Sequence, residues 1–163
     1  MGDCERFLSA CRGRRGRVWV SGEGNLLATL LFESGKPATE IALLGFATGL
    51  AIAQTFESFG AVRPVGLKWP NDVMLGDAKA AGILLDSGSG SQGKLWVALA
   101  FGVNIAAAPA GLDQPTTCLR EALPEGVSAP APVAFFAGLR PRLSAWCERL
   151  AGEGFSPLRE AWL

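Results

Sequence analysis

The chain has 163 residues, with 15 Lys and Arg balanced by 15 Asp and Glu, and 49% of its residues are hydrophobic. That length and apolar content suit one domain with a substantial core, and a net charge of zero excludes a global attraction to nucleic acid or anionic membranes. The chain has no histidine, which excludes Ser/His and Cys/His nucleophile pairs, histidine general bases and His-ligated zinc.

The cysteines indicate a reducing cellular compartment, and the apolar stretches indicate that the chain does not enter a membrane. Cys4, Cys11, Cys118 and Cys147 show no C-x-x-C spacing, so we interpret them as reduced thiols rather than disulfide or metal ligands. The most apolar stretch, residues 41–53, is too short to cross a bilayer and predicts a buried helix. The N-terminal residues lack an apolar signal region. We therefore expect a cytoplasmic protein that does not enter a membrane.

The first half of the chain predicts a basic loop, a strand and a helix. Residues 1–24 are polar and glycine-bearing, which is typical of a mobile loop. Residues 25–32 contain no breaker and predict a strand covered on both faces. Pro37 begins a helix with apolar residues at helical spacing, and Gly60 ends it in the left-handed conformation.

The residues after the helix predict four strands, over residues 65–69, 73–75, 80–86 and 94–105. Gly76 and Asp77 separate two of them with the chemistry of a hairpin turn, and the Gly/Ser-rich residues 87–93 form a flexible tip. Strands in hairpins with helices between them predict an α+β domain with a mixed, mostly antiparallel sheet packed by helices.

The last third of the chain predicts helices. Residues 106–132 form a Pro-, Gly- and Ala-rich connector with one short helix near residues 118–123. A longer helix covers residues 133–150, and Pro141 should kink it or split it in two. Another helix begins at residue 157.

A basic cluster is the first candidate site. It comprises Arg12, Gly13, Arg14, Arg15, Gly16 and Arg17. Arginine forks and glycine-exposed backbone amides suit a phosphate, although an RNA-binding arm or a solvated basic loop has the same composition. Trp19 follows the cluster and could stack on a purine or pack in the core.

A second cluster lies where a predicted strand ends. Residues 68–72 read Lys-Trp-Pro-Asn-Asp, and Lys79 enters the next strand, so a hairpin brings a cation, an amide and a carboxylate together. Gly82 interrupts a strand of bulky residues and indicates close approach of a ligand to the backbone. An ordinary charged surface turn is the alternative interpretation. Gly102 and Asn104 close the following strand.

These motifs, in this order and spacing, resemble the catalytic domain of biotin protein ligase, also called biotin–[acetyl-CoA-carboxylase] ligase. The motifs that carry the resemblance are residues 12–17, Trp19, residues 24–26, 68–72, 79–84 and 102–104. The resemblance runs from about residue 10 to the end and implies a fold similar to class II aminoacyl-tRNA synthetases. We expect residues 1–163 to form one catalytic domain that lacks the family's N-terminal elements, its DNA-binding helix-turn-helix and its small C-terminal β-barrel.

The resemblance implies two half-reactions. Biotin and Mg-ATP first give biotinyl-5′-adenylate and pyrophosphate, and a lysine of the biotin carboxyl carrier protein then displaces AMP. Arg14, with Arg12 and Arg15, would neutralise the phosphates inside a loop that orders on ligand binding. Lys79 would bridge the biotin carboxylate and the α-phosphate, and Lys79→Ala is expected to abolish adenylate formation while leaving the fold intact.

The remaining roles are also implied by the resemblance. Trp19 would pack against the adenine, and Asp72 would orient the acceptor amine. The backbone of Gly82, Ile83 and Leu84 would line the pocket for biotin and the adenylate. Residues expected on the ATP side are Lys68, Asn71, Asp72 and Asn104, of which the last three would also lie near the magnesium ion.

The sequence departs from the family pattern around the biotin ring. The family's Ser-Thr-Asn motif lies upstream of this chain, Leu8 and Ser9 occupy the region of a family Gln, Cys11 replaces a Gly, and Ala100 replaces another. We therefore expect weaker binding of biotin than of ATP. A lipoate or octanoate ligase and a non-catalytic remnant that binds nucleotide or carrier stay open as alternatives, as does a homodimer formed through a sheet edge.

Overall fold

The structure is a computed structural model that describes the backbone of residues 11–12 and 18–163, with side chains from Trp19 onward. A five-stranded sheet has the order β3-β7-β6-β5-β4, and every neighbouring pair in it is antiparallel. Its strands are β3 (Leu26–Ser34), β4 (Val65–Lys68), β5 (Asp72–Leu75), β6 (Ala78–Ser89) and β7 (Leu95–Val103). The predicted α+β class and its antiparallel hairpins are confirmed.

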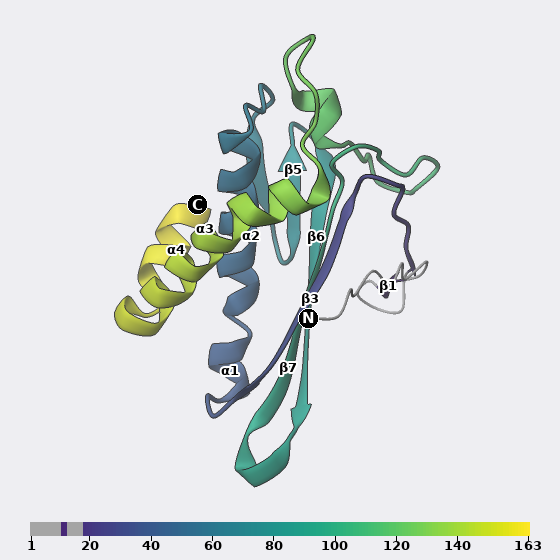
Figure 1. Ribbon diagram of the computed structural model, residues 1–163. Coiled ribbons are helices and arrows are strands. Elements are labelled where there is room, and N and C mark those ends of the chain that lie inside the picture. Colours follow the sequence, from purple (N-terminus) through teal and green to yellow (C-terminus); the bar gives the residue numbers. More distant parts are fainter. Residues whose placement is uncertain (1–10, 13–17) are drawn as a thin grey trace.

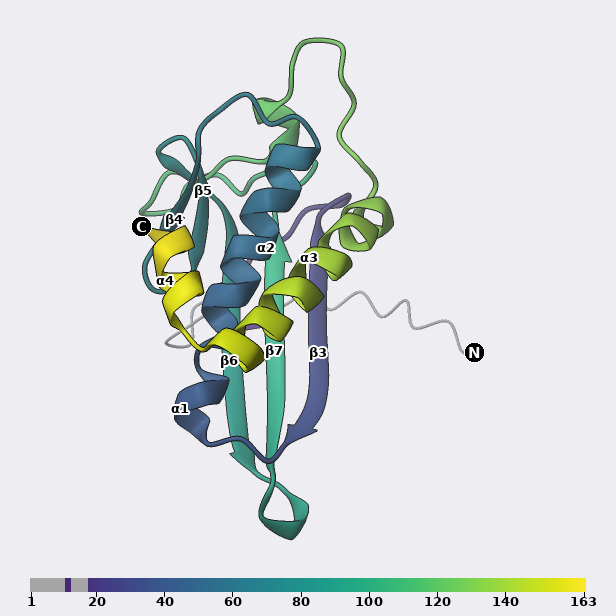
Figure 2. The same cartoon turned by 90° about the vertical axis from the view of Figure 1, so that its left-hand side faces the viewer.

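Helices cover one face of this sheet, as the two views of the ribbon show (Figures 1 and 2). They are α1 (Ala38–Ile41), α2 (Leu44–Ser58), α3 (Pro132–Glu153) and α4 (Ser156–Trp162), with short 3-10 turns at Ser91–Gly93 and Leu119–Ala122. A small ribbon of β1 (Cys11–Arg12) and β2 (Val18–Trp19) pairs separately, and β1 lies on the side of the sheet away from the helices (Figure 1).

The core fills the space between α2, α3 and the sheet. Alternate residues of the central strands point into it, so Ile83, Phe101 and Val103 are buried, as expected for a sheet with one covered face. Phe135 of α3 is fully buried and packs on Phe56 of α2 with ring centroids 5.4 Å apart. The residues on the opposite face of the same strands are not covered by the helices, so they can contribute to a binding site.

Strand β3 corrects the prediction of a strand covered on both faces. It is an edge strand, and its outward residues have no helix above them, so Leu31 is 74% exposed. Residues 25–32 gave the wrong signal because leucines lie on both faces of the strand, and no charged residue in that range marks the exposed side.

The helices follow the predicted positions with two differences. The first helical segment breaks between Ile41 and Leu44 into α1 and α2, and Gly60 follows with φ +85° as predicted. Pro141 does not split α3, which is one helix. The proline lies on the exposed side while Leu139 and Leu143 pack into the core on either side of it, so tertiary packing offsets the one lost backbone hydrogen bond.

The stretch Ala38–Ser58, which contains α1 and α2, is long and apolar enough to cross a membrane by length and composition alone. In this domain its longer part, α2, packs against the sheet. Ala47, Ile52 and Phe56 are fully buried in the shared core, which agrees with the prediction of a buried helix.

Candidate active site

The predicted strand-exit cluster forms an ion pair on the face of the sheet that has no helices. Lys79 Nζ of β6 lies 2.7 Å from Asp72 Oδ1 of β5, and the two side chains are 15% and 14% exposed. The turn at Gly76, with φ +60°, joins the two strands, and a bulge follows Val73. The hairpin therefore brings the two residues together as the sequence predicted.

Two glycines make a flat floor beside this pair. Asp72 pairs with Gly82 across β5 and β6, and Gly82 pairs with Gly102 across β6 and β7, so the three lie in one row on one face. The indole of Trp19 lies on the two glycines. A methyl group added at Gly82 would come within 2.8 Å of the Trp19 ring, and one added at Gly102 would lie closer still to the ring atoms Cε2, Nε1 and Cζ2.

Lys79 also contacts the tryptophan. Its Nζ lies 5.3 Å from the centroid of the Trp19 ring, within the range of a cation–π interaction. The ammonium group thus has a carboxylate and an aromatic face as partners, and it stands at the edge of the glycine floor. A carboxylate or phosphate placed on that floor would meet a positive charge.

Polar atoms without hydrogen-bond partners gather in the same place. Among the described residues, the buried side-chain atoms with no hydrogen bond are Trp19 Nε1, Asp72 Oδ1 and Asn104 Oδ1. Asp72 Oδ1 touches the Lys79 ammonium but not in hydrogen-bond geometry. Native proteins leave few such atoms. Asp72 Oδ1 already has the Lys79 ammonium as its charged partner, so Trp19 Nε1 is the atom at the floor that a ligand could complete.

The other residues of the strand-exit motif have structural duties. Asn71 Nδ2 donates to the carbonyl of Ile83 at 2.8 Å, and the Ile83 amide donates to the carbonyl of Asn71 at 2.9 Å. These two bonds fix the turn at Asn71 against β6, and the side chain of Ile83 faces the core. That the backbone of Ile83 lines a ligand pocket stays a prediction. Leu84 is half-buried on the floor side. Lys68 is exposed and pairs with Asp72 across β4 and β5.

Asn104 is buried, and its side-chain amide is bonded within the protein. It is 1% exposed, and its Nδ2 donates to the carbonyl of Thr117 at 3.1 Å. The sequence gave no role to Thr117, whose amide donates to the carbonyl of Lys79 at 3.0 Å. The segment that the sequence described only as a connector thus fixes the backbone of Lys79, and a single sequence carries no signal for that pairing.

Asn25 is a second residue whose work the sequence did not show. Its Oδ1 accepts hydrogen bonds from the amides of Ile105, Ala106 and Ala107, and its Nδ2 donates to the Ala107 carbonyl. Asn25 therefore shapes the chain where it leaves β7, next to Asn104. The motif at residues 24–26 serves the frame of the site.

Several residues of the predicted basic cluster lie outside the described part of the chain. These are Gly13, Arg14, Arg15, Gly16 and the side chain of Arg12. The residues that the structure describes contain no group of three or more His, Cys, Asp or Glu that could hold a metal ion. Asp72 is the carboxylate at the floor, which suits an ion brought in by a phosphate ligand rather than one caged by the protein.

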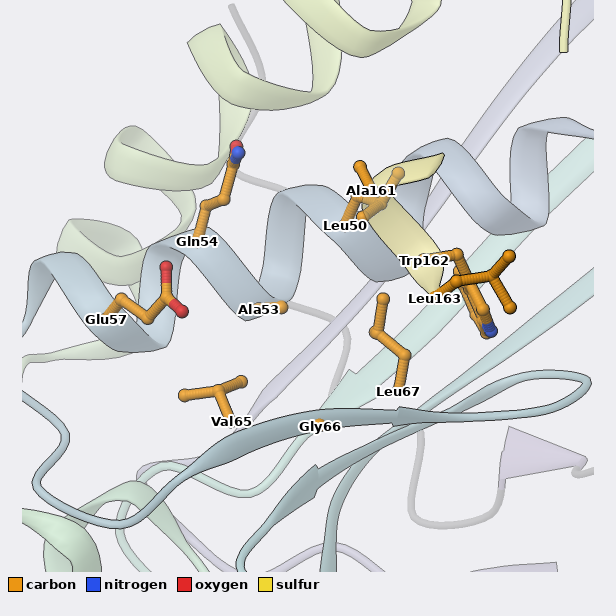
Figure 3. Close-up of a pocket in the computed structure, with 10 residues that line it drawn as sticks. All are labelled: Leu50, Ala53, Gln54, Glu57, Val65, Gly66, Leu67, Ala161, Trp162 and Leu163. Atoms are coloured by element: carbon orange, nitrogen blue, oxygen red, sulfur yellow. The ribbon is translucent and has the colours of Figure 1, made fainter. Parts of the chain in front are cut away.

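A groove of about 510 Å³ lies elsewhere, between α2, β4 and the end of α4. Figure 3 shows Leu50 and Ala53 of α2 facing Val65 and Leu67 of β4, with Trp162 at one end. It holds none of the predicted site residues and lies on the helix side of the sheet, so we place the candidate active site at the glycine floor.

Comparisons with known proteins identify the family to which the chain is similar. The model of the Biotin/lipoate A/B protein ligase family matches residues 9–104. The biotin–[acetyl-CoA-carboxylase] ligase of Paracoccus denitrificans is 40% identical over 94% of this chain and 65% of its own length. That of Mycobacterium tuberculosis is 34% identical over 75% of this chain and 44% of its own length.

Solved structures share the fold. The biotin protein ligase from Aquifex aeolicus in complex with biotin and ATP has a TM-score of 0.73 at 26% identity, covering 93% of this chain and 62% of that one. The biotin protein ligase from Leishmania major in complex with biotin has a TM-score of 0.76 at 22% identity, covering 94% and 66%. The chain spans 65% or less of the two curated relatives. Because the family model matches residues 9–104, more than half of the chain, the chain belongs to the Biotin/lipoate A/B protein ligase family.

Proposed function

We propose that this chain is the catalytic domain of an ATP-dependent biotin–protein ligase, which forms biotinyl-5′-AMP and passes biotin to a lysine of a biotin carboxyl carrier protein. The observation that carries the proposal is the Lys79–Asp72 ion pair at the edge of a floor of two glycines. The names of the relatives from Paracoccus and Mycobacterium, and the biotin and ATP in the Aquifex complex, support the choice of substrates.

The first half-reaction joins two anions. An oxygen of the biotin carboxylate attacks the α-phosphorus of ATP, the bond to the β-phosphate oxygen breaks, and pyrophosphate leaves. No proton has to be removed, so a chain without histidine suffers no handicap. Lys79 would lie between carboxylate and α-phosphate, where its charge offsets their repulsion and the charge that develops between them.

The arginines of residues 12–17 would complete the phosphate site. Arg14, with Arg12 and Arg15, would bind the phosphates through paired donors, and the loop would close over the adenylate to keep water from the mixed anhydride. Trp19 would contact the adenine. Magnesium would enter with ATP, neutralise its phosphates and take oxygen ligands near Asn71, Asp72 and Asn104.

The second half-reaction needs an uncharged amine. The carrier's lysine nitrogen attacks the acyl carbon, the bond to the phosphate oxygen breaks, AMP leaves and the amine loses a proton. Asp72 would orient the incoming amine once Lys79 has been engaged by the bound anions. ATP supply and unpaired thiols fit a cytoplasmic setting, which we include in the proposal.

The test is to give the purified chain Mg-ATP with biotin, lipoate or octanoate and to detect each acyl adenylate by mass spectrometry. We expect biotinyl-AMP with biotin, its loss in Lys79→Ala, and its retention in Lys36→Ala, which removes an exposed lysine that also pairs with an acid. A lipoyl or octanoyl adenylate as the main product would favour the lipoate ligase alternative. No adenylate with any acid would favour a non-catalytic remnant.

A further inference from the structure

Trp19 occupies the surface on which the proposed ligand must lie. Its ring covers Gly82 and Gly102 so closely that a methyl group at either glycine would overlap it. The same ring faces the Lys79 ammonium. A ligand that brings a carboxylate and a phosphate to Lys79 over the glycine floor would therefore have to take the place of the indole.

The indole N–H of Trp19 lacks the hydrogen bond that a buried tryptophan in the core of this protein makes. Trp19 Nε1 is buried and has no hydrogen-bond acceptor, so the N–H has lost water without gaining a partner. Trp146, in the core, donates from its Nε1 to Gln54 Oε1 at 3.0 Å. The Trp19 ring thus gains contact with the floor but bears an unfavourable polar term.

The backbone of Trp19 is held lightly as well. Strand β2 has two residues, and within the described part of the chain it pairs with the two residues of β1, Cys11 and Arg12. The nine residues of β7, which carry Gly102, pair on both sides with long strands. The floor is therefore the rigid partner, and Trp19 is the one that can leave.

We infer that Trp19 is a removable occupant of the glycine floor, whose ring leaves Gly82 and Gly102 when biotin and ATP bind there. The inference rests on the proposed function for the identity of the ligand. Ligand and ring compete for one surface, so the measured affinity falls by the fraction of molecules in which the floor is free. Removing the ring should raise the affinity for biotin, which carries no adenine for Trp19 to contact.

Fluorine NMR on protein labelled with fluorotryptophan reads the ring directly. The chain has five tryptophans, and Trp19→Phe assigns the Trp19 signal. Trp96 is a matched internal control, because it covers Gly88 as closely as Trp19 covers Gly82 but at the far end of the β6–β7 hairpin. We expect biotin alone, which carries no adenine, to move the Trp19 signal to a solvent-exposed environment, judged by its shift between H₂O and D₂O, while the Trp96 signal stays.

Two variants, each with a control, test whether the Trp19 ring occupies the glycine floor: one in the absence of ligand and one through its affinity for biotin. Gly102→Ala should expose the Trp19 signal in the absence of ligand, and Gly88→Ala should expose that of Trp96 instead. Trp19→Ala should bind biotin alone at least about threefold more tightly by calorimetry, and Trp96→Ala should leave that affinity unchanged.

The outcomes separate this inference from the proposed function. Heat of binding with a Trp19 signal that does not move would overturn the inference and leave the ligase function standing. A Trp19 signal unaffected by Gly102→Ala, or weaker biotin binding by Trp19→Ala, would also overturn it. No heat with biotin, with Mg-ATP or with both would contradict the proposed function itself.

Discussion

The Lys79–Asp72 pair predicts a large loss of stability when its carboxylate is removed. Asp72→Ala leaves an ammonium group that is 15% exposed without its charged partner. Exposed pairs contribute about 0–1 kcal/mol, and breaking a fully buried pair costs about 3–5 kcal/mol. Because some solvent reaches this pair and the Trp19 ring remains as a partner, we expect a cost of about 2–3 kcal/mol.

The assay is urea unfolding followed by circular dichroism at pH 7, with Glu40→Ala as the matched control. Glu40 pairs with Lys36 at 3.1 Å, but those side chains are 52% and 64% exposed, so the control should lose less than about 0.5 kcal/mol. The double variant Asp72→Leu with Lys79→Met removes both charges and should lose less than Asp72→Ala does. Equal losses in Asp72→Ala and Glu40→Ala would refute the reasoning.

Further predictions concern the frame of the site and the thiols. Asn25→Ala removes the acceptor of three backbone amides and should cost about 2–4 kcal/mol in urea unfolding, whereas a loss below about 1 kcal/mol would show that water replaces the side chain. Phe135→Ala empties a fully buried site and should cost about 3–5 kcal/mol, measured in the same way. Burial raises the pKa of the Cys118 and Cys147 thiols above the ordinary 9.0. Alkylation of both by iodoacetamide should therefore be slower at pH 8 than that of a free thiol, and their contribution to stability should be lost as pH rises beyond 9; rates matching a free thiol would contradict this.

The strand-exit motif was predictable because its residues are close in sequence. A two-residue turn fixes where β5 and β6 pair, so Lys79 had to return to the neighbourhood of Asp72. Gly82 was also a local signal, because a glycine inside a strand of bulky residues often marks a place where another group approaches the backbone closely. The sequence predicted that Lys79 and Asp72 lie close together but not their 2.7 Å ion pair. Because of that pair, we now expect Lys79→Ala to lower stability while leaving the fold intact.

Long-range contacts account for what the sequence did not show. Asn25 reaches residues 80 or more positions away, and Thr117 joins Lys79 from a connector with no periodic pattern. Asn104 carries a motif typical of a ligand contact, yet the Thr117 carbonyl takes its amide. Pro141 predicted a break in α3 because propensity is local, whereas the core contacts that keep the helix whole are tertiary.

The central claim, that this chain activates biotin with ATP at Lys79, is tested most directly by isotope exchange between pyrophosphate and ATP. We expect exchange that requires biotin, proceeds without any carrier protein, persists in Lys36→Ala and disappears in Lys79→Ala. Exchange that is absent in the parent chain, independent of biotin, or undiminished in Lys79→Ala would contradict it.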